Sequence, residues 1–341
     1  MELLDNLSKQ EMIEVLLGMR DKRKWDTKDW SRAVGLKQYV LEDVISGIIS
    51  ISKDDFKDLL LVTEKASSSG LMRFSEPIVI LSWARKGGNG KTTIATNLTY
   101  HLGAMGYNTL GIDGDSQADM TSTFFPDYLQ MKEKNIYDAM IRRKDFRNYV
   151  IHTNYDNIDI VPGSGKTEEL ERTFSAMPEE IAMDTFKECL KDIIKENYYD
   201  FVVVDMDKTM GLLNKTFLNG AKYVLAIGEC SFYSIKALIP VMERIEMIKG
   251  TNSKLDCLGL VFNKVDLRKG EVERAREDAS GIFKWPILKT YISSDAAIEN
   301  SQRATMPLGA YKNSSRANKQ FKKLTIEVLE TIEKEQEGAG E

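Results

Sequence analysis

Short apolar runs alternate with longer amphipathic stretches over most of this chain. The runs are Ile78–Ala84, Thr109–Asp113, Ile158–Val161, Phe201–Asp205, Tyr223–Ile227, Leu258–Phe262 and Ile287–Ile292. Apolar runs of this length are typical of strands buried on both faces, and the stretches between them have the apolar spacing of helices. The alternation predicts an α/β fold with a mostly parallel, doubly wound sheet covered by helices on both faces.

The first part of the chain has a different pattern, which predicts helices alone. Ser8 and Glu11 have the spacing of a capping box, and an apolar helical face follows them. The serine-rich segment Ser67–Gly70 is typical of a linker. We therefore expect a small all-α domain over residues 1–70 and an α/β domain over residues 71–341.

Residues 35–47 have the spacing of a helix-turn-helix, with Gly35 in the turn. The stretch is similar to the repressor-type helix-turn-helix family. In that motif the first residues of the second helix contact base edges. The resemblance therefore nominates three DNA-contacting residues: Lys37, Gln38 and Tyr39.

The charge of this domain favours a different interpretation. Glu42 and Asp43 lie on the same predicted helix, where carboxylates would be repelled by DNA phosphates. Residues 1–70 contain 11 Lys and Arg against 13 Asp and Glu, a net charge of −2. A DNA-reading domain and a docking or dimerisation domain both stay open.

A glycine-rich loop joins the first predicted strand of the α/β domain to a helical stretch. It reads Lys86-Gly87-Gly88-Asn89-Gly90-Lys91-Thr92-Thr93. Glycines let successive backbone N–H groups approach an anion closely, and a helix N-terminus adds partial positive charge. We expect Lys91 to contact the β- and γ-phosphates of a nucleotide and Thr92 to bind magnesium. The other expected nucleotide-binding residues are Gly87, Gly88, Asn89, Gly90 and Thr93.

This loop departs from the usual phosphate-loop spacing. The first glycine of that spacing would fall at Arg85, and Lys86 supplies an additional lysine. The form K-G-G-x-G-K-T resembles the deviant Walker A motif of the ParA/MinD family of ATPases. The resemblance implies a P-loop NTPase fold, ATP and Mg²⁺ as cofactors, and slow ATP hydrolysis. It also implies a homodimer formed on ATP binding, in which Lys86 reaches the partner's phosphates as a catalytic residue.

Two aspartates end predicted strands, Asp113 and Asp205, and Asp115 follows the first of them by two residues. Asp113 and Asp115 resemble the family's D-x-D-P-Q segment, although Ser116 replaces the proline. By that resemblance Asp115 would position the attacking water and Asp113 would support the magnesium shell. Asp205 ends an apolar run, as in a Walker B motif, and would hold Mg²⁺ through a water. Met206–Lys208 departs from the family's small residues and prolines, which indicates altered hydrolysis or dimer contacts.

Two further stretches resemble nucleotide-binding motifs. Asn263–Asp266 reads N-K-x-D, the guanine-reading motif of GTPases. The deviant loop is the more specific signal, so we favour ATP over GTP and expect Asn263 to contact the base. Gly163–Thr167 reads G-S-G-K-T, but Ile160 occupies the position of the first glycine. We interpret this second loop as a chance similarity.

Composition narrows the class of protein. Hydrophobic residues make up 42% of the chain and charged residues 29%, as in globular proteins. No apolar run reaches 18 residues and the first residues are acidic, so we expect no membrane span, no signal peptide and a cytoplasmic location. The cysteines Cys189, Cys230 and Cys257 are far apart in sequence, which is typical of reduced core residues.

The net charge of −5 confines any DNA contact to local basic patches. One basic group near residues 264–276 is balanced by carboxylates, so DNA contact and a solvated helix face stay equally open there. A second group lies near and on the predicted C-terminal helix: Arg303, Lys312, Arg316, Lys319, Lys322 and Lys323. Family resemblance implies that such a surface binds double-stranded DNA without sequence preference. The acidic C-terminus lacks the basic polar face of a membrane-binding helix, so no membrane partner is expected.

These features favour an ATPase that partitions plasmid or chromosomal DNA on the nucleoid. The resemblance implies that a ParB-like centromere-binding protein stimulates its hydrolysis. One alternative is an ATPase that positions a protein cargo or the division site. Another is a transcription regulator that uses the nucleotide as a switch.

Overall fold

The computed structural model describes residues 8–22, 27, 30, 38–48, 56, 74–127, 134–208, 210–268 and 270–338. Within these ranges an eight-stranded sheet has the order β3-β4-β2-β5-β1-β6-β7-β8. Its strands are β1 (Ile78–Trp83), β2 (Thr109–Asp113), β3 (Ile151–His152), β4 (Ile158–Val161), β5 (Phe201–Asp205), β6 (Tyr223–Gly228), β7 (Asp256–Val265) and β8 (Ile287–Ser293). All neighbours pair in parallel except β3 and β4, which are antiparallel. The predicted fold class is confirmed.

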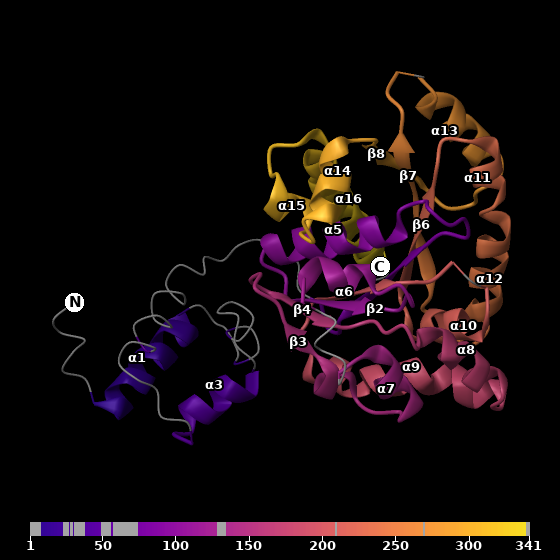
Figure 1. Cartoon of the computed structure of the whole chain (residues 1–341). Helices are drawn as coiled ribbons and strands as arrows, with labels where there is room; N and C mark the ends of the chain where they lie inside the picture. Colours follow the sequence, from indigo (N-terminus) through magenta and orange to yellow (C-terminus); the bar gives the residue numbers. More distant parts are fainter. Residues whose placement is uncertain are drawn as a thin grey trace.

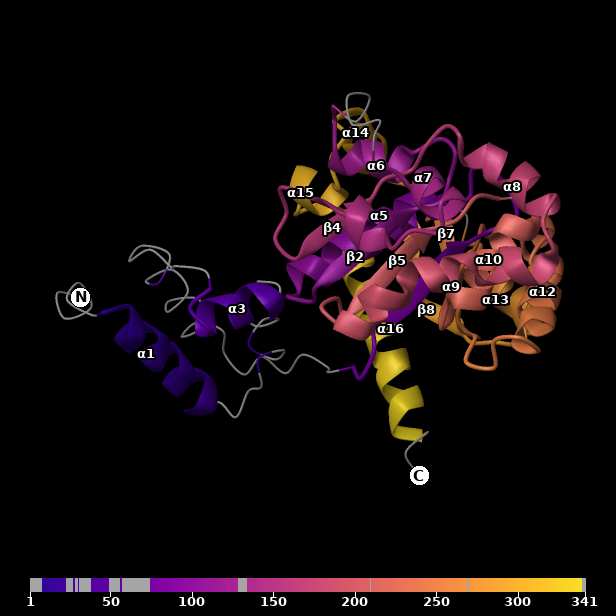
Figure 2. The ribbon, with the colours of Figure 1, turned by 90° about the horizontal axis from the view of Figure 1, so that it is seen from below.

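Helices pack on both faces of the sheet (Figure 1). One face is covered by α5 (Lys91–Ala104), α6 (Asp119–Phe124), α14 (Ala296–Arg303), α15 (Leu308–Tyr311) and α16 (Arg316–Gly338). The other face is covered by α7 (Ile136–Ile141), the 3₁₀ helix η3 (Phe146–Tyr149), α8 (Thr167–Ser175), α9 (Glu179–Glu196), α10 (Leu212–Gly220), α11 (Phe232–Lys236), α12 (Ile239–Lys249) and α13 (Val272–Ser280). Each face has its own apolar core. The C-terminal turns of α16 extend beyond the sheet (Figure 2).

Two helices are described before the sheet, α1 (Lys9–Lys22) and α3 (Gln38–Ile45). The predicted capping box is present, because the Ser8 backbone N–H donates to Glu11 Oε2 at 2.7 Å and the Glu11 N–H donates to Ser8 Oγ at 3.3 Å. Several apolar side chains of this part are buried and belong to neither core of the sheet: Met12, Leu16, Trp30, Leu41 and Phe56. A separate N-terminal domain remains our proposal, and the expected linker lies outside the described residues.

The predicted DNA-reading residues of this region are placed only in part. Lys37 lies outside the described residues. Gln38 and Tyr39 begin α3, as the helix-turn-helix pattern predicts, and nothing is described of their side chains. Glu42 is exposed on the same helix. DNA reading by this helix therefore stays a prediction.

Candidate active site

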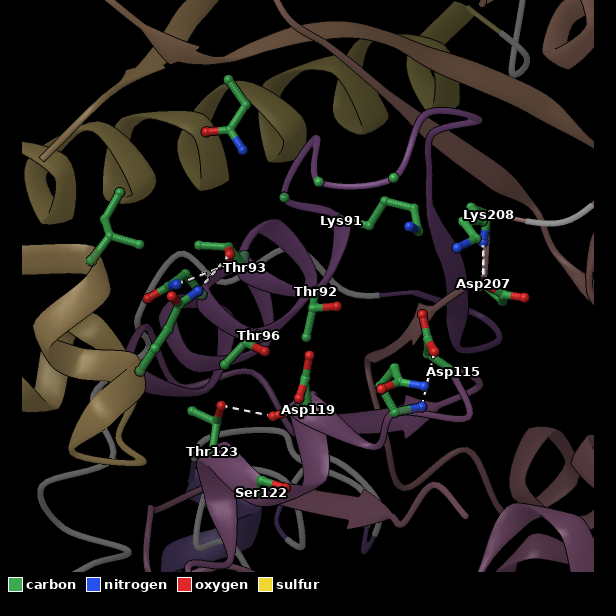
Figure 3. A pocket seen from close by; sticks show the side chains of 18 of the residues that line it. Lys91, Thr92, Thr93, Thr96, Asp115, Asp119, Ser122, Thr123, Asp207 and Lys208 are labelled. Carbon is green, nitrogen blue, oxygen red and sulfur yellow. Dashed lines mark hydrogen bonds between the residues drawn. The ribbon is translucent and has the colours of Figure 1, made fainter. Parts of the chain in front are cut away.

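A cleft of about 1270 Å³ lies at the carboxyl ends of the central strands. Ligands of open α/β sheets bind at this end of the strands. Its lining comes mostly from the glycine-rich loop after β1, the loops after β2, β5 and β8, the end of β7, and the helices α5, α8 and α14. Figure 3 shows part of this lining. Most of the sequence-predicted loop residues line it: Gly87, Gly88, Gly90, Lys91, Thr92, Thr93, Asp115 and Asn263.

The glycine-rich loop has the backbone of a phosphate cradle. Gly88 and Gly90 have φ angles of 81° and 84°, a left-handed conformation that favours glycine. A Cβ atom on Gly90 would lie 2.1 Å from Nδ2 of Asn263. Helix α5 begins at Lys91, directly after this turn. The loop and the first turn of the helix therefore present backbone N–H groups to the cleft.

Asn263 supports this loop from β7. Its side-chain amide is buried and donates to the backbone oxygen of Asn89 at 2.7 Å. Asn89 in turn donates to Ser234 Oγ at 3.4 Å, so the loop is fixed from two sides. The described contacts make Asn263 a residue that holds the loop. Its contact with a base stays a prediction.

Two aspartates that end neighbouring strands lie in register, Asp113 on β2 and Asp205 on β5. Both are fully buried. Asp113 accepts from the backbone N–H and hydroxyl of Thr121 at 2.8 and 2.6 Å. Neither carboxylate oxygen of Asp205 has a hydrogen-bond partner of good geometry in the described part of the chain. A buried carboxylate of this kind would be stabilised by a bound cation.

The electrostatics of this pair fit a cation. Burial, and then the charge of Asp113, raise the pKa of Asp205 well above its usual value, whereas the hydroxyl of Thr92 and the charge of Lys91 oppose the rise. Mg²⁺ prefers oxygen ligands and uses one or two carboxylates together with substrate phosphates. Thr92 and Asp205 fit that donor set. Asp113 is committed to Thr121 at the start of α6, and its support of a magnesium shell stays a prediction.

Asp115 lies in the loop after β2 and lines the cleft. Its Oδ1 atom accepts from the backbone N–H of Gln117 at 3.0 Å, which orients the side chain. Burial raises the pKa of Asp115, Asp207 raises it further, and Lys91 lowers it. In Figure 3 the Asp115 side chain lies below the ammonium end of Lys91. That Asp115 orients a water attacking a terminal phosphate stays a prediction.

Lys86 points elsewhere. Its ammonium nitrogen lies 3.2 Å from Oε2 of Glu229, and about half of the side chain is exposed. It is absent from the lining of the cleft in its own chain. This position agrees with a lysine that acts on another subunit, and that action stays a prediction.

Several cleft residues were not expected from the sequence. Gln302 on α14 donates to the hydroxyl of Thr93 at 3.0 Å across 209 positions of sequence. No local pattern signals such a contact. Asp207 and Lys208 also line the cleft. The sequence showed that this segment departs from the family pattern, but it did not predict that these side chains lie in the cleft.

The loop Gly163–Thr167, which resembles a second phosphate loop in sequence, packs against the carboxylate of Asp113. The Gly163 backbone N–H donates to the hydroxyl of Thr121 at 2.8 Å, and a Cβ at Gly163 would lie 2.8 Å from Cγ of Asp113. This glycine is required by close packing at the cleft wall. The contacts agree with a structural role, and its lack of phosphate binding stays a prediction.

The basic residues of the C-terminal part are exposed on α14, α16 and the turn between α15 and α16. None of them forms an ion pair with a described carboxylate: Arg303, Lys312, Arg316, Lys319, Lys322 and Lys323. In the group near residues 264–276, by contrast, Arg268 pairs with Asp266 and Arg276 donates to the backbone oxygen of Lys289. The C-terminal set is the stronger candidate for a phosphate-backbone contact.

Other expectations concern cysteines and membranes. Cys189 and Cys257 are buried, and burial raises the pKa of both thiols to about 12, in agreement with reduced core residues. Within the described residues, no three or more His, Cys, Asp or Glu side chains form a metal-binding group. Among the described helices, none combines the length and hydrophobicity that a membrane span requires.

Relatives of known sequence share most of this chain. The chromosome partitioning protein ParA of Caulobacter vibrioides is 24% identical over 261 residues, which cover 75% of this chain and 95% of that protein. The sporulation initiation inhibitor protein Soj of Bacillus subtilis is 25% identical over 249 residues, which cover 72% of this chain and 95% of that protein.

A solved structure and a family model extend this comparison. The septum site-determining protein MinD of Pyrococcus horikoshii, solved with Mg-ADP, matches with a TM-score of 0.60 and 22% identity over 74% of this chain and 95% of that chain. At this identity the match supports the fold alone. A family model described as an AAA domain matches residues 78–257, more than half of the chain. This protein therefore belongs to that AAA domain family and is a P-loop ATPase of the ParA/MinD type.

Proposed function

We propose that this protein is a DNA partition ATPase whose affinity for DNA is controlled by ATP. The observation that carries the proposal is the position of α14. Gln302 on this helix contacts Thr93 of the phosphate loop, and its neighbour Arg303 belongs to the exposed basic set. One short helix thus connects the nucleotide cleft to a candidate DNA surface.

The nucleotide is ATP with Mg²⁺. Lys91 and the backbone of residues 87–93 bind its phosphates, and Thr92 with Asp205 holds the metal ion. The ion supplies charge neutralisation for phosphoryl transfer. Asp115 orients the attacking water, while Asn263 holds the loop and borders the base.

ATP binding drives homodimer formation, with Lys86 released from Glu229 to reach the partner's phosphates. The dimer doubles the basic surface, so the number of DNA phosphates neutralised per particle doubles as well. A ParB-like protein bound at a centromere stimulates slow hydrolysis and releases the dimer. The protein is then cytoplasmic and associated with the nucleoid, with no membrane partner.

Binding to random-sequence duplex DNA, measured with ATP, ADP or no nucleotide at two salt concentrations, tests this function. We expect tight binding only with ATP, weakened by about tenfold or more when the salt concentration is raised fourfold. Lys86→Ala should lose the tight DNA binding that ATP produces in the wild type. The variant Lys319→Ala/Lys322→Ala/Lys323→Ala removes binding at either salt.

A matched control replaces exposed lysines on the opposite face of the sheet, in Lys191→Ala/Lys195→Ala on α9. This variant keeps ATP-dependent DNA binding. Binding that ignores the nucleotide, or an equal loss in both lysine variants, would contradict the proposed function.

A second candidate is an ATPase that positions a protein cargo or the division site, with residues 1–70 as an adaptor. The exposed Glu42 and net charge of −2 of this segment favour protein docking over DNA reading. Removal of residues 1–70 separates this candidate from the partition ATPase: loss of cargo recruitment supports the adaptor, and loss of operator binding supports a partition ATPase that also represses its operon. A regulator that uses the nucleotide as a switch is the third candidate, and near-zero hydrolysis even with partner protein and DNA would support it.

A further inference from the structure

The segment after Asp205 brings a second lysine to the phosphate loop. Asp207 and Lys208 both line the cleft. Figure 3 shows them together with Asp115 in front of the ammonium end of Lys91. Because Lys91 is the residue expected to contact the β- and γ-phosphates, this is the end of the cleft where we expect the phosphates.

Backbone contacts hold the segment in place. The Gly114 N–H donates to the backbone oxygen of Asp205 at 2.9 Å. The buried side chain of Asn214 on α10 donates to the backbone oxygen of Asp207 at 3.2 Å, and Arg244 on α12 donates to that of Met210 at 2.8 Å. The position of Lys208 is therefore determined by the packed helices behind it.

The side chain of Lys208 lies against the phosphate loop. Its Cδ atom is 3.7 Å from the position that a Cβ would take on Gly87, an ordinary van der Waals contact. A methyl group at Gly87 would therefore also fit beside this stem. The Lys208 ammonium forms no ion pair with a described carboxylate, whereas Lys86 is paired with Glu229 at 3.2 Å.

We propose that Lys208 binds the terminal phosphate of ATP within its own subunit and makes the cleft prefer ATP over ADP. This inference rests on the proposed nucleotide function and adds a residue to it. Lys91 contacts the β- and γ-phosphates from the helix side, and Lys208 approaches from the β5 side. An ammonium is a compact point charge that suits a single phosphate oxygen. ADP lacks the terminal phosphate that Lys208 contacts, so the lysine raises the affinity for ATP and leaves the affinity for ADP almost unchanged.

Dissociation constants of a non-hydrolysable ATP analogue and of ADP, both with excess Mg²⁺, test the proposal. The variant Lys208→Met keeps an unbranched apolar stem against Gly87 and removes the charge. We expect its affinity for the ATP analogue to fall about tenfold and its affinity for ADP to change less than about twofold. Lys208→Arg restores most of the preference, because it restores the charge.

The measurement is made at a protein concentration low enough for sedimentation to show that the nucleotide-bound protein is monomeric, so that a lysine from a partner does not contribute. Under these conditions the control variant Lys191→Ala/Lys195→Ala, on the opposite face of the sheet, keeps the wild-type preference. Lys208→Ala, which also removes the stem, separates charge from packing: its preference falls as far as that of Lys208→Met.

Two results would overturn the inference. Lys208→Met could keep the wild-type ratio of affinities, or Lys208→Arg could lose that ratio as completely as Lys208→Met does. Wild-type protein that binds neither nucleotide would instead overturn the proposed function, and this inference with it. Retained binding of both nucleotides by Lys208→Met, with an unchanged ratio, leaves the proposed function intact.

Discussion

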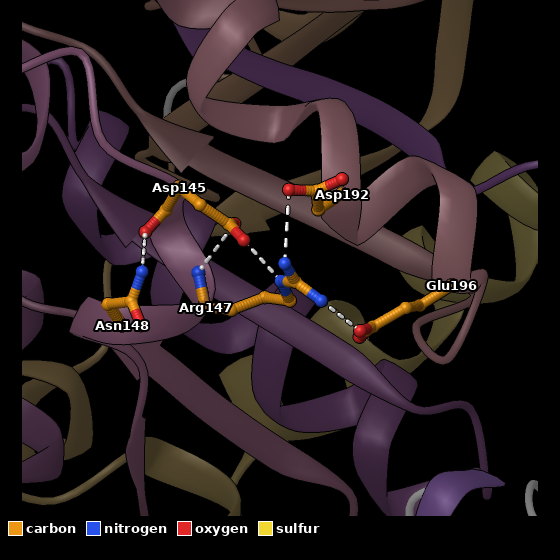
Figure 4. A network of polar contacts seen from close by, with 5 residues as sticks. All are labelled: Asp145, Arg147, Asn148, Asp192 and Glu196. Atoms are coloured by element: carbon orange, nitrogen blue, oxygen red, sulfur yellow. Dashed lines mark hydrogen bonds and ion pairs between the residues drawn. The ribbon is translucent and has the colours of Figure 1, made fainter.

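Charged side chains are arranged in opposite ways in two regions of this molecule. On the surface of η3 and α9, Arg147 contacts the carboxylates of Asp145, Asp192 and Glu196, with Asp192 at 3.0 Å (Figure 4). Each of these four charges has a partner, and all four side chains are partly exposed. In the cleft, Asp205 is fully buried, lies beside another carboxylate and has no hydrogen-bond partner of good geometry within the described residues.

The difference separates structural charges from functional ones. A partly exposed ion pair contributes little to stability and costs little to form. A buried carboxylate without a partner destabilises the folded state, because it has lost its hydration. The chain keeps such a group where a metal ion and phosphates would supply the missing charge. The carboxylate that destabilises the protein without nucleotide is therefore the one that would bind the metal ion.

The largest effect is expected for Asp205→Asn in the cleft, which is compared with the same aspartate-to-asparagine change on the surface. Asp205→Asn removes the buried charge, so ATP hydrolysis should fall by about 100-fold or more. Without nucleotide, the free energy of unfolding should stay unchanged or rise by about 1 kcal/mol, because a buried repulsion is relieved. Steady-state hydrolysis and denaturant unfolding without magnesium measure the two effects.

Asp192→Asn is the matched control for this substitution. It removes one of three carboxylates that contact Arg147, so hydrolysis should stay at the wild-type level and stability should not rise. If Asp205→Asn lowered the stability of the nucleotide-free protein by several kcal/mol, Asp205 would be a structural residue and the comparison would break.

A smaller effect is expected at the other end of α5, where His101 is buried and contacts Asn318 at 3.0 Å. Burial, with a contribution from the charge of Lys322, lowers the pKa of His101 from 6.5 to about 4. The folded state therefore binds this proton less readily than the unfolded state. The stabilising contribution is complete above pH 6.5 and is lost as the pH falls toward 4, at most about 3 kcal/mol.

Unfolding of wild-type protein and His101→Gln from pH 7 to 4 measures this contribution. The free energy of unfolding of the wild type should fall more steeply than that of the variant over this range. Parallel curves for the two proteins would assign the acid sensitivity to other groups.

The smallest effect is expected for Arg147→Ala. The Arg147 side chain is 41% exposed, so solvent screens the three ion pairs. We expect a loss of about 1 kcal/mol at low salt, which shrinks as salt is added, with unchanged ATP hydrolysis. A loss of hydrolysis in this variant would show that the network is coupled to the cleft.

Much of the architecture follows from local pattern. Mainly apolar runs predicted β2, β4 and β5 with their observed bounds, and every residue of these three strands is buried, as expected for strands covered on both faces. The predicted β7 was too short, since the strand continues through Asn263 and Lys264, which are polar. β3 was missed because its two residues form no pattern.

The sequence itself pointed to the phosphate loop, since the left-handed backbone at Gly88 and Gly90 favours glycine. The buried aspartates at strand ends were likewise readable, because parallel strands align their carboxyl ends. Tertiary structure alone decided which partners these groups meet: Lys86 with Glu229, Thr93 with Gln302, and Lys208 with Gly87. Those contacts join elements far apart in sequence, or on separate loops, and their geometry depends on how helices pack on the sheet. The sequence determines the chemical type of each side chain, whereas the packing of helices on the sheet determines which side chains come into contact.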